Sequence, residues 1–313
     1  MILVTGGLGY LGGQICKELI NSGEEVRIGT SRISAKIPLA LSQCQLVNID
    51  LLKTESLIAA CKGIDSIIHL AALNAQESNL DPKQALLINS LGTENLLNAA
   101  ILSKVNRFLY FSTVHVYDNV SKTTITESTI TEPRHQYAIT HKLAEDYVLQ
   151  ARNSISISIF RLSNVIGSPI SKEVNCWMLI AHDLCKQVII SGSMKINANK
   201  KITRDFIGLS DLSRITHNYI ANNKKFEKIQ NEILNISSGE AMSLENLAKK
   251  IATESEKVFH FKPKIKYNNR SDKKIESLVI SNKKAKSLGL VFNPNLNEEI
   301  NLLLRNCKIW FGT

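Results

Sequence analysis

The sequence lacks the marks of a secreted, metal-binding or membrane protein. Its six cysteines are scattered along 313 residues, form no C-x-x-C pair and have no histidine at zinc-ligand spacing. They predict free, partly buried thiols in a reducing compartment and no metal site. No apolar run reaches the ~18 residues that cross a bilayer, and a strand pattern begins at residue 2 in place of a signal peptide. We therefore expect a cytoplasmic protein with no membrane partner.

Internal repeats and low-complexity segments are also absent, and no run of lysines is interleaved with aromatic residues. The formal net charge of +10 therefore indicates solvated lysines and a positive field that favours anionic ligands. A nucleic-acid partner is not expected, because such proteins gather basic side chains into one patch or stripe. The length allows one large or two modest domains with a buried core.

Glycine is concentrated near the start of the chain. Residues 2–12 read Ile-Leu-Val-Thr-Gly-Gly-Leu-Gly-Tyr-Leu-Gly, and a helical pattern follows at once. The stretch fits both G-x-G-x-x-G and G-x-x-G-x-x-G, and its context predicts a strand, a tight turn and a helix N-terminus. The free N–H groups and the positive dipole end of such a helix attract phosphates. Glycines here allow the turn, the approach of a pyrophosphate and close helix packing. The predicted dinucleotide contacts are Gly6, Leu8, Gly9, Tyr10, Leu11 and Gly12.

Acidic residues are missing from the segment that follows the second predicted strand, 25–29. Dinucleotide folds often place Asp or Glu there to bind the ribose 2′-hydroxyl, yet no acid occurs between Val26 and Ile49. Ser31 and Arg32 stand there instead, and a hydroxyl with a guanidinium would bind a 2′-phosphate that an acid would repel. The sequence favours NADP over NAD, although a solvated arginine at a strand end would look the same.

Strand and helix patterns alternate over the first 165 residues, which predicts an α/β fold with a Rossmann-like, doubly wound parallel sheet. Beyond that point the alternation fades into a smaller mixed C-terminal part. We expect residues 1–165, with parts of 203–240, to form the NAD(P)-binding domain, and residues 166–202 and 241–313 to form a substrate-binding domain. The later elements expected are helices at 177–187, 211–222 and 243–254, strand and turn at 186–199, a strand at 232–236, and two short helices in the tail.

These motifs, in this order, resemble those of the extended short-chain dehydrogenases/reductases, in the nucleotide-sugar epimerase/dehydratase branch. The resemblance covers nearly the whole chain. Besides the glycine-rich turn, it rests on His69-Leu70-Ala71-Ala72, Asn89 with Gly92-Thr93, Arg161 with residues 164–167, and Arg204-Asp205-Phe206-Ile207. It implies further cofactor contacts from Asp50, Leu51, Leu70, Ala71, Ala72 and Asn89. It implies substrate contacts from Asn164, Arg204 and Arg270.

The resemblance also implies the catalytic groups. Tyr137 would be the acid–base tyrosine, and Thr113, directly after the strand predicted at 107–112, would hold the substrate hydroxyl. A tyrosine with its usual pKa near 10 is a poor base at pH 7 and needs a nearby cation. In the family a lysine four residues later, on the same helix face, supplies that charge and bonds the nicotinamide ribose. The resemblance therefore implies that Tyr137 and the residue at position 141 also contact the cofactor.

This chain departs from that pattern, because position 141 is histidine and the lysine is at 142. Glu145 stands where the family often has an acid, so the register is unshifted, and Lys142 points about 100° away from residue 141. His141 could lower the tyrosine pKa as an imidazolium or bond the ribose as a neutral ring. Either a pH-dependent enzyme or a protein that binds cofactor but turns over little would result.

A second departure concerns residues 113–115. The family's 4,6-dehydratases resemble Thr-Asp-Glu at this strand end, whereas this chain has Thr113-Val114-His115. The acid and base of water elimination are missing, which disfavours dehydration. His115 could be an extra proton donor that faces the sugar, or a core histidine.

The sequence thus predicts a homodimeric enzyme that uses NADP, or NAD, on a nucleotide sugar, as an epimerase or a keto-sugar reductase. The alternative is a catalytically weak or inactive dinucleotide-binding regulatory or scaffold protein of the same fold. The nucleotide, the sugar and the carbon that changes stay open.

Overall fold

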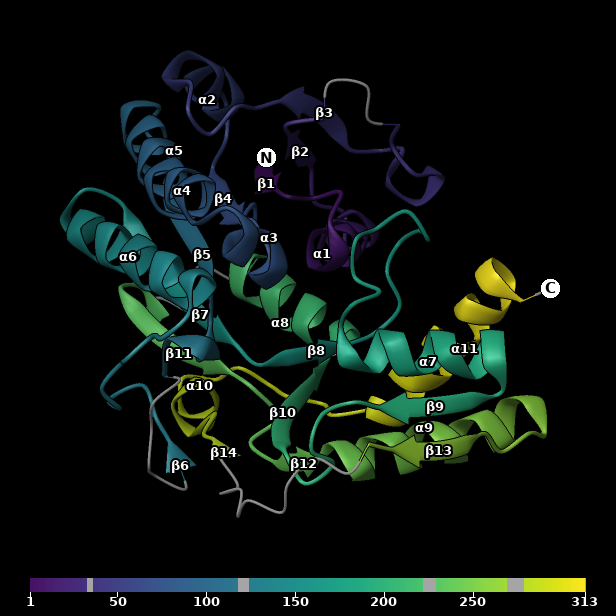
Figure 1. The fold of residues 1–313 in the computed structure, drawn as a ribbon. Helices are drawn as coiled ribbons and strands as arrows, with labels where there is room; N and C mark the ends of the chain where they lie inside the picture. The colour runs from purple at the N-terminus through teal and green to yellow at the C-terminus, as the bar shows by residue number, and fades with distance from the viewer. Residues whose placement is uncertain (33–35, 118–123, 222–228, 269–278, 313) are drawn as a thin grey trace.

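The computed structural model describes residues 1–32, 36–117, 124–221, 229–268 and 279–312. Its centre is a seven-stranded sheet in the order β3-β2-β1-β4-β5-β7-β11, with every neighbouring pair parallel (Figure 1). The strands are β1 (Ile2–Thr5), β2 (Val26–Thr30), β3 (Gln45–Asn48), β4 (Ser66–His69), β5 (Arg107–Thr113), β7 (Ser156–Leu162) and β11 (Glu232–Ile236). The strand order reverses between β1 and β4, and such a switch point opens a crevice for ligands at the carboxyl ends of the strands.

Helices cover both faces of this sheet because successive strand residues point to opposite sides. In β1, Ile2 and Val4 join one core cluster, whereas Leu3 joins the other. The first cluster packs under α1 (Tyr10–Asn21) and α8 (Leu209–Ala221). The second packs under α2 (Thr54–Cys61), α5 (Gly92–Leu102) and α6 (Gln136–Gln150). The predicted Rossmann-like, doubly wound α/β fold is therefore confirmed.

A third core cluster lies beside the sheet and draws on later parts of the chain (Figure 1). Two small sheets border it: a mixed one with a parallel and an antiparallel pair, and a two-stranded parallel one. Their strands are β8 (Asn164–Ile166), β10 (Thr203–Gly208), β12 (Ala241–Ser243), β9 (Ser193–Ile196) and β13 (Lys264–Tyr267). The helices are α7 (Ile180–Ser191), α9 (Leu244–Phe259) and α11 (Leu296–Phe311). The expected smaller mixed C-terminal part is present.

The shorter elements connect these layers. They are η1 (Leu39–Leu41), α3 (Ala75–Leu80), α4 (Pro82–Ala85), the π-helical turn η2 (Leu86–Leu91), η3 (Val114–Tyr117), β6 (Thr124–Ile125), η4 (Ala151–Asn153), β14 (Val279–Ile280) and α10 (Lys283–Ser287). The helical stretch formed by α4, η2 and α5 thus contains a π turn, a feature often found at functional sites. That turn carries Asn89.

Two expected elements of the C-terminal part differ in the structure. Helix α7 runs to Ser191, through the stretch 186–191 where a strand was expected, and β9 begins only at Ser193. Burial of Val188 in the third cluster overrides the strand propensity of this β-branched segment, and Gly192 in the left-handed conformation ends the helix. Among the described residues of the tail, α10 is a short helix, whereas α11 has 16 residues and buries Ile300, Leu303 and Leu304.

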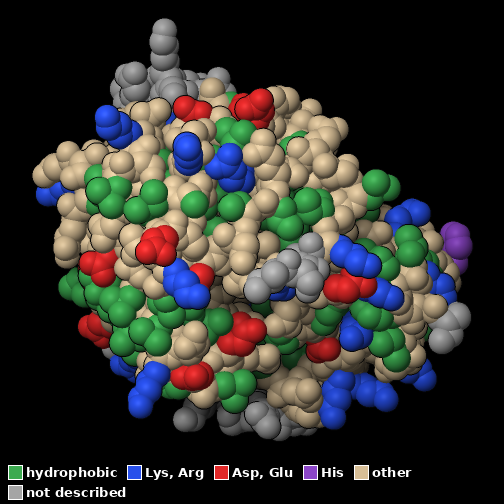
Figure 2. Space-filling model, turned by 90° about the horizontal axis from the view of Figure 1, so that it is seen from above, with side chains coloured by type: hydrophobic (Ala, Val, Ile, Leu, Met, Phe, Trp, Pro, Cys, Tyr) green, Lys and Arg blue, Asp and Glu red, His purple; other side chains and the backbone are tan. Residues whose placement is uncertain are grey.

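The cysteines, the apolarity of the helices and the surface charges can be compared with the sequence expectations. The six cysteines are free, as expected, and all of them are buried, whereas the sequence predicted partial burial. In the described residues, no helix is long and apolar enough to cross a membrane. On the face seen in Figure 2, lysine and arginine side chains are spread out and acidic side chains lie among them.

Candidate active site

The glycine-rich turn joins β1 to α1 at the switch point of the sheet. Gly6 has φ +70°, which only glycine adopts without strain. A Cβ on Gly12 would lie 2.3 Å from the Gly6 carbonyl oxygen, so glycine is required where α1 packs on the turn. Gly9 is the N-cap of α1, no side chain caps it, and the first turn holds no acid. The uncapped N–H groups of the first helical turn can therefore donate hydrogen bonds to a phosphate here, and the helix dipole favours its negative charge.

The end of β4 forms the neighbouring wall of this cradle. A Cβ on Gly6 would lie 3.0 Å from the Ala71 backbone nitrogen, which brings Leu70 and Ala71, with Ala72 following, beside the turn. The Thr5 hydroxyl accepts hydrogen bonds from the backbone N–H groups of Leu70 and Ala71 at 3.2 and 3.3 Å. The residues present thus fit a dinucleotide: the wall is built of small groups, and the cradle is a space that a Cβ would fill.

His69 stabilises this wall from inside. Its Nδ1 lies 2.7 Å from the Thr5 hydroxyl and its Nε2 lies 2.9 Å from the Thr93 hydroxyl. Since the Thr93 hydroxyl donates to the Asn89 carbonyl at 2.7 Å, it accepts from His69, whose proton therefore sits on Nε2. Burial lowers the pKa of His69 to about 3, so this histidine is neutral.

The side chains expected around the adenosine end lie at the ends of β2 and β3. Ser31 and Arg32 are exposed, and the Arg32 guanidinium donates to the Leu8 carbonyl of the glycine-rich turn at 3.3 Å. Asp50 accepts from the Leu52 N–H at 3.0 Å, and buried Leu51 packs against Gly92. Arg32 and the turn are thus neighbours in space, although 20 positions separate Gly12 from Arg32 in the chain.

Tyr137 lies in the first turn of α6, next to the carboxyl end of β5. Burial raises the pKa of Tyr137 to about 12, and a side-chain hydrogen bond with Thr113 acts in the opposite direction. Thr113 is buried at the end of β5, and its hydroxyl also accepts from the His115 N–H at 3.2 Å. The structure therefore brings together the tyrosine and the threonine that the resemblance pairs, and none of the described residues supplies a cation that lowers the pKa of the tyrosine.

His141 lies one helical turn beyond Tyr137, with 4.4 Å between the ring centroids. Its Nδ1 is 2.7 Å from the Tyr110 hydroxyl, and its buried Nε2 has no hydrogen-bond partner among the described residues. Burial, helped by the charges of His115 and His135, lowers the pKa of His141 to about 3. The imidazolium alternative therefore fails at neutral pH, whereas the orphaned Nε2 can bond a ribose hydroxyl.

Lys142 does not replace the missing cation, since its ammonium pairs with Asp146 on the same helix. Asn89 is buried in η2, where its side chain accepts from the Leu73 N–H at 2.7 Å and donates to the Thr140 hydroxyl at 3.1 Å. This bond ties η2 to α6 beside His141.

Two further imidazoles surround Tyr137. The His115 and His135 rings lie 6.4 and 6.1 Å from the Tyr137 ring and 5.3 Å from each other, between centroids. His135 is the N-cap of α6 and accepts the Ala138 N–H at its Nδ1. The sequence-based prediction did not include His135 among the site residues, although a histidine two positions before the expected tyrosine, at the start of a predicted helix, could have indicated it.

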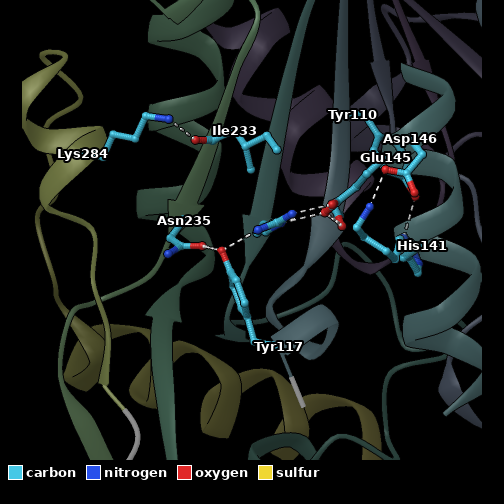
Figure 3. A network of polar contacts seen from close by, with 11 residues as sticks. Tyr110, Tyr117, His141, Glu145, Asp146, Ile233, Asn235 and Lys284 are labelled. Carbon is cyan, nitrogen blue, oxygen red and sulfur yellow. Dashed lines mark hydrogen bonds and ion pairs between the residues drawn. The ribbon is translucent and has the colours of Figure 1, made fainter. Parts of the chain in front are cut away.

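A buried ion pair anchors the middle of α6 to the sheet (Figure 3). Glu145 accepts from the Arg161 guanidinium at 2.6 and 2.8 Å and from the Ser112 hydroxyl at 2.6 Å. Arg161 also donates to the Tyr117 hydroxyl, which donates in turn to Asn235 at 3.0 Å. Arg161 and Tyr117 thus fix α6, β7 and β11 to one another.

The expected substrate contacts are only partly placed. The Asn164 amide donates to the Asp205 carbonyl at 3.1 Å, so β8 and β10 lie together beyond the sheet. Arg204, in β10, is exposed. Asp205 is buried and its carboxylate accepts from the backbone N–H groups of Ser238, Gly239 and Glu240, which shapes the loop before β12. Arg270 lies outside the described residues.

Comparisons with known proteins agree with this arrangement. Residues 2–237 match the model of the NAD dependent epimerase/dehydratase family. The chain is 28% identical over 240 residues to a GDP-6-deoxy-D-talose 4-dehydrogenase from Aggregatibacter actinomycetemcomitans, covering 76% of this chain and 74% of the relative. It is 26% identical over 306 residues to a putative UDP-glucose 4-epimerase from Methanocaldococcus jannaschii, covering 96% of both.

A solved structure shares the fold over nearly the full length. The UDP-glucuronic acid 4-epimerase from Bacillus cereus, in complex with UDP-glucuronic acid and NAD, superposes with a TM-score of 0.81. The alignment covers 99% of each chain at 24% identity.

Proposed function

Because this chain belongs to the NAD-dependent epimerase/dehydratase family, we propose that it is an NAD(P)-dependent enzyme that transfers hydride to or from the sugar of a nucleotide sugar. The observation that carries the proposal is the contact of Tyr137 with Thr113 beside His141, at the carboxyl edge of the sheet that also holds the glycine-rich cradle. When bound, the nicotinamide supplies or accepts the hydride.

The roles of the residues follow from their chemistry. The Tyr137 oxygen takes the proton of a sugar hydroxyl during oxidation, or gives its proton to a sugar carbonyl during reduction. Thr113 holds that sugar oxygen through its hydroxyl, and His115 stands ready as a second proton donor. His141, neutral, orients the ribose through Nε2. Gly6, Gly9 and Gly12 hold the pyrophosphate, with Leu8, Tyr10 and Leu11 around it.

The remaining contacts complete the two binding regions. Asp50, Leu51, Leu70, Ala71, Ala72 and Asn89 would line the cofactor, and Asn164, Arg204 and Arg270 would hold the nucleotide sugar. Two carboxylates that eliminate water in a dehydratase have no counterpart at positions 114 and 115, which are valine and histidine. Dehydration is therefore disfavoured, and epimerisation and keto-sugar reduction stay as the two candidate reactions.

We propose NADP as the cofactor, with NAD as the alternative. The support is Arg32, whose guanidinium already reaches the glycine-rich turn, together with the lack of any Asp or Glu in the sequence between Val26 and Ile49 that could repel a 2′-phosphate. A charge-assisted bond is worth about 1.5–3 kcal/mol, so Arg32→Ala should weaken NADP binding by ~10- to 100-fold and leave NAD binding unchanged. Calorimetric titration with each dinucleotide tests this, and equal losses for both would refute the choice of NADP.

We propose that the protein is a homodimer joined through η2 and α6. Leu86, Leu87 and Ile139 leave apolar surface exposed on these neighbouring helices. Light scattering on the wild type and on Leu87→Glu tests this: the variant should be a monomer, and a monomeric wild type would contradict it.

The second candidate is a dinucleotide-binding protein with little turnover. His141 motivates it, because a neutral imidazole leaves Tyr137 with a raised pKa where the family has a lysine. The deciding experiment follows nicotinamide absorbance and sugar products with UDP-, GDP-, CDP- and dTDP-sugars. The enzyme proposal predicts turnover that Tyr137→Phe abolishes while cofactor still binds. Dinucleotide binding without turnover in the wild type would favour the second candidate.

A further inference from the structure

The three imidazoles near Tyr137 differ in their access to solvent. His141 is buried, with 3% of its surface exposed, and is neutral for that reason. His115 and His135 are only half-buried. Of the three imidazoles, only this second pair has substantial contact with solvent.

The structure fixes the protonation pattern of His135. Its Nδ1 accepts the backbone N–H of Ala138 at 3.3 Å, so Nδ1 carries no proton and the ring proton sits on Nε2. Histidine is not among the residues preferred as N-caps, where Ser, Thr, Asp and Asn serve best. Helix capping alone therefore gives no reason for an imidazole at this position.

The capping bond also fixes where the His135 ring lies. The ring is nearly parallel to that of Tyr137, at 11° and 6.1 Å, and it meets the His115 ring edge-on at 5.3 Å. His115 comes from η3, directly after the strand that ends on Thr113. Two separate segments thus present imidazoles to one tyrosine, at spacings that hydrogen bonds or one bridging water can span.

We propose that His115 carries protons between the Tyr137 oxygen and solvent, and that His135 is the positioning residue that holds the His115 ring for this transfer. The proposal rests on the hydride-transfer function proposed above and adds His135 to its machinery. Tyr137 packs against both rings, the charges of His115 and His135 act on the buried His141, and Glu132 and Arg134 precede His135 in the chain.

The proton balance shows when such a carrier is needed. In epimerisation Tyr137 takes a proton from the sugar and later returns it, so no net proton enters the site. In reduction of a keto-sugar, each turnover adds one hydride and one proton, and Tyr137 becomes a phenolate. The His115 imidazolium then gives its proton to the Tyr137 oxygen and regains one from water. The carrier therefore favours a reaction with net proton uptake or release.

Replacement of His135 separates its two roles. His135→Asn keeps a side-chain oxygen that can cap α6 but removes the imidazole, whereas His135→Ala removes both. His260→Asn, at the exposed C-cap of α9, is the matched control, because asparagine tolerates the left-handed conformation there. For each variant we would measure melting temperature, the pH profile of keto-sugar reduction, and rescue by imidazole in the buffer.

We expect His135→Asn to melt like the wild type, to lose about 10²-fold in the rate of reduction above pH 7, and to regain part of it with added imidazole. His135→Ala should also melt lower. A wild-type rate and pH profile in His135→Asn would reduce His135 to a cap and overturn the proposal.

A second readout does not depend on turnover. The protonation midpoint and tautomer of His115 can be followed by nuclear magnetic resonance in the cofactor-free protein. We expect both to change in His135→Asn and to stay unchanged in His260→Asn. An unchanged His115 in His135→Asn would overturn the proposal even if the wild type proves inactive. If the proposed hydride-transfer function is wrong, the wild type will be inactive, but the protonation midpoint and tautomer of His115 will still change in His135→Asn.

Discussion

The glycine-rich turn and the first turns of α6 meet at the same edge of the sheet, but they are built on different principles. In the turn, backbone conformation and backbone contacts determine the geometry of the phosphate cradle: Gly6 needs its positive φ, and Gly12 lies against the Gly6 carbonyl. In α6, the backbone is ordinary, and side-chain protonation decides the chemistry. The surroundings of His141 keep it neutral, so the residue that would activate Tyr137 carries no charge.

This difference indicates that the glycine-rich turn and the surroundings of Tyr137 tolerate amino-acid substitutions to different degrees. A cradle made of backbone N–H groups holds any phosphate, so its function survives wide variation around it. A tyrosine whose pKa must be lowered depends on one neighbouring charge. The two regions should therefore respond to mutation and to pH in different ways.

Acidification should have the largest effect, and it acts on the histidine side of the comparison. His69, His141 and His182 are buried and their pKa values fall to about 3, 3 and 4, mainly through burial. Since the folded pKa lies below the unfolded value near 6.5, the unfolded chain binds more protons between these limits. Stability is then full above pH 6.5 and is lost as pH falls, by on the order of 1–3 kcal/mol per histidine near pH 4.

Denaturant unfolding between pH 7.5 and 4 measures this slope. Burial raises the pKa values of Asp205 and Glu299, which offsets part of the loss. His141→Gln should lower the number of protons taken up on unfolding by about one, which makes the dependence of the unfolding free energy on pH less steep. A stability independent of pH in this window would show that the three histidines are not held neutral.

Loss of the buried ion pair should be nearly as large. Glu145→Gln leaves the Arg161 charge buried without its partner, which costs about 3–5 kcal/mol. The matched control lies one residue later: Asp146→Asn removes a partly exposed pair with Lys142 and should cost at most ~0.5 kcal/mol. Urea unfolding of both variants measures the contrast, and equal costs would mean that α6 is not anchored through Glu145.

On the cradle side, Gly12→Ala should act through packing. Its Cβ meets the Gly6 oxygen at 2.3 Å and the Gly7 Cα at 2.7 Å, so we expect a loss of about 1–3 kcal/mol in stability together with cofactor affinity. Gly9→Ala is the control, because its Cβ meets only the Gly6 oxygen, at 3.0 Å. It should fold well yet bind dinucleotide weakly. Dinucleotide binding equal to the wild type in Gly9→Ala would place the phosphates elsewhere.

The last expected change concerns the acid–base chemistry and not the stability, and it restores the lysine that the resemblance implies. His141→Lys places an ammonium one turn from Tyr137, and an opposite charge at that range lowers a pKa by about 1–3 units. Ultraviolet difference titration against the Tyr137→Phe version of the same chain reports the phenolate directly. A tyrosine pKa that stays high would show that position 141 does not act on Tyr137.

The same contrast explains what the sequence could predict. The turn and the doubly wound sheet follow from residue types, because glycine spacing and β-branched runs specify local backbone geometry. The neutral state of His141 could not be predicted, since it depends on burial and on the charges of His115 and His135, which lie near it only in the folded chain. The extent of α7 likewise depended on packing of Val188 against distant residues, and the position of His135 beside His115 depended on two loops that meet only in the fold.

The most direct test of the account is the protonation state of His141. Nitrogen chemical shifts of its imidazole, assigned by comparison with His141→Gln, can be followed from pH 8 to pH 4.5. A buried ring with a pKa near 3 should remain a single neutral tautomer throughout. A His141 that titrates at pH 6.5 or above would contradict the account, because the site would then hold a cation beside Tyr137 in the place of the missing lysine.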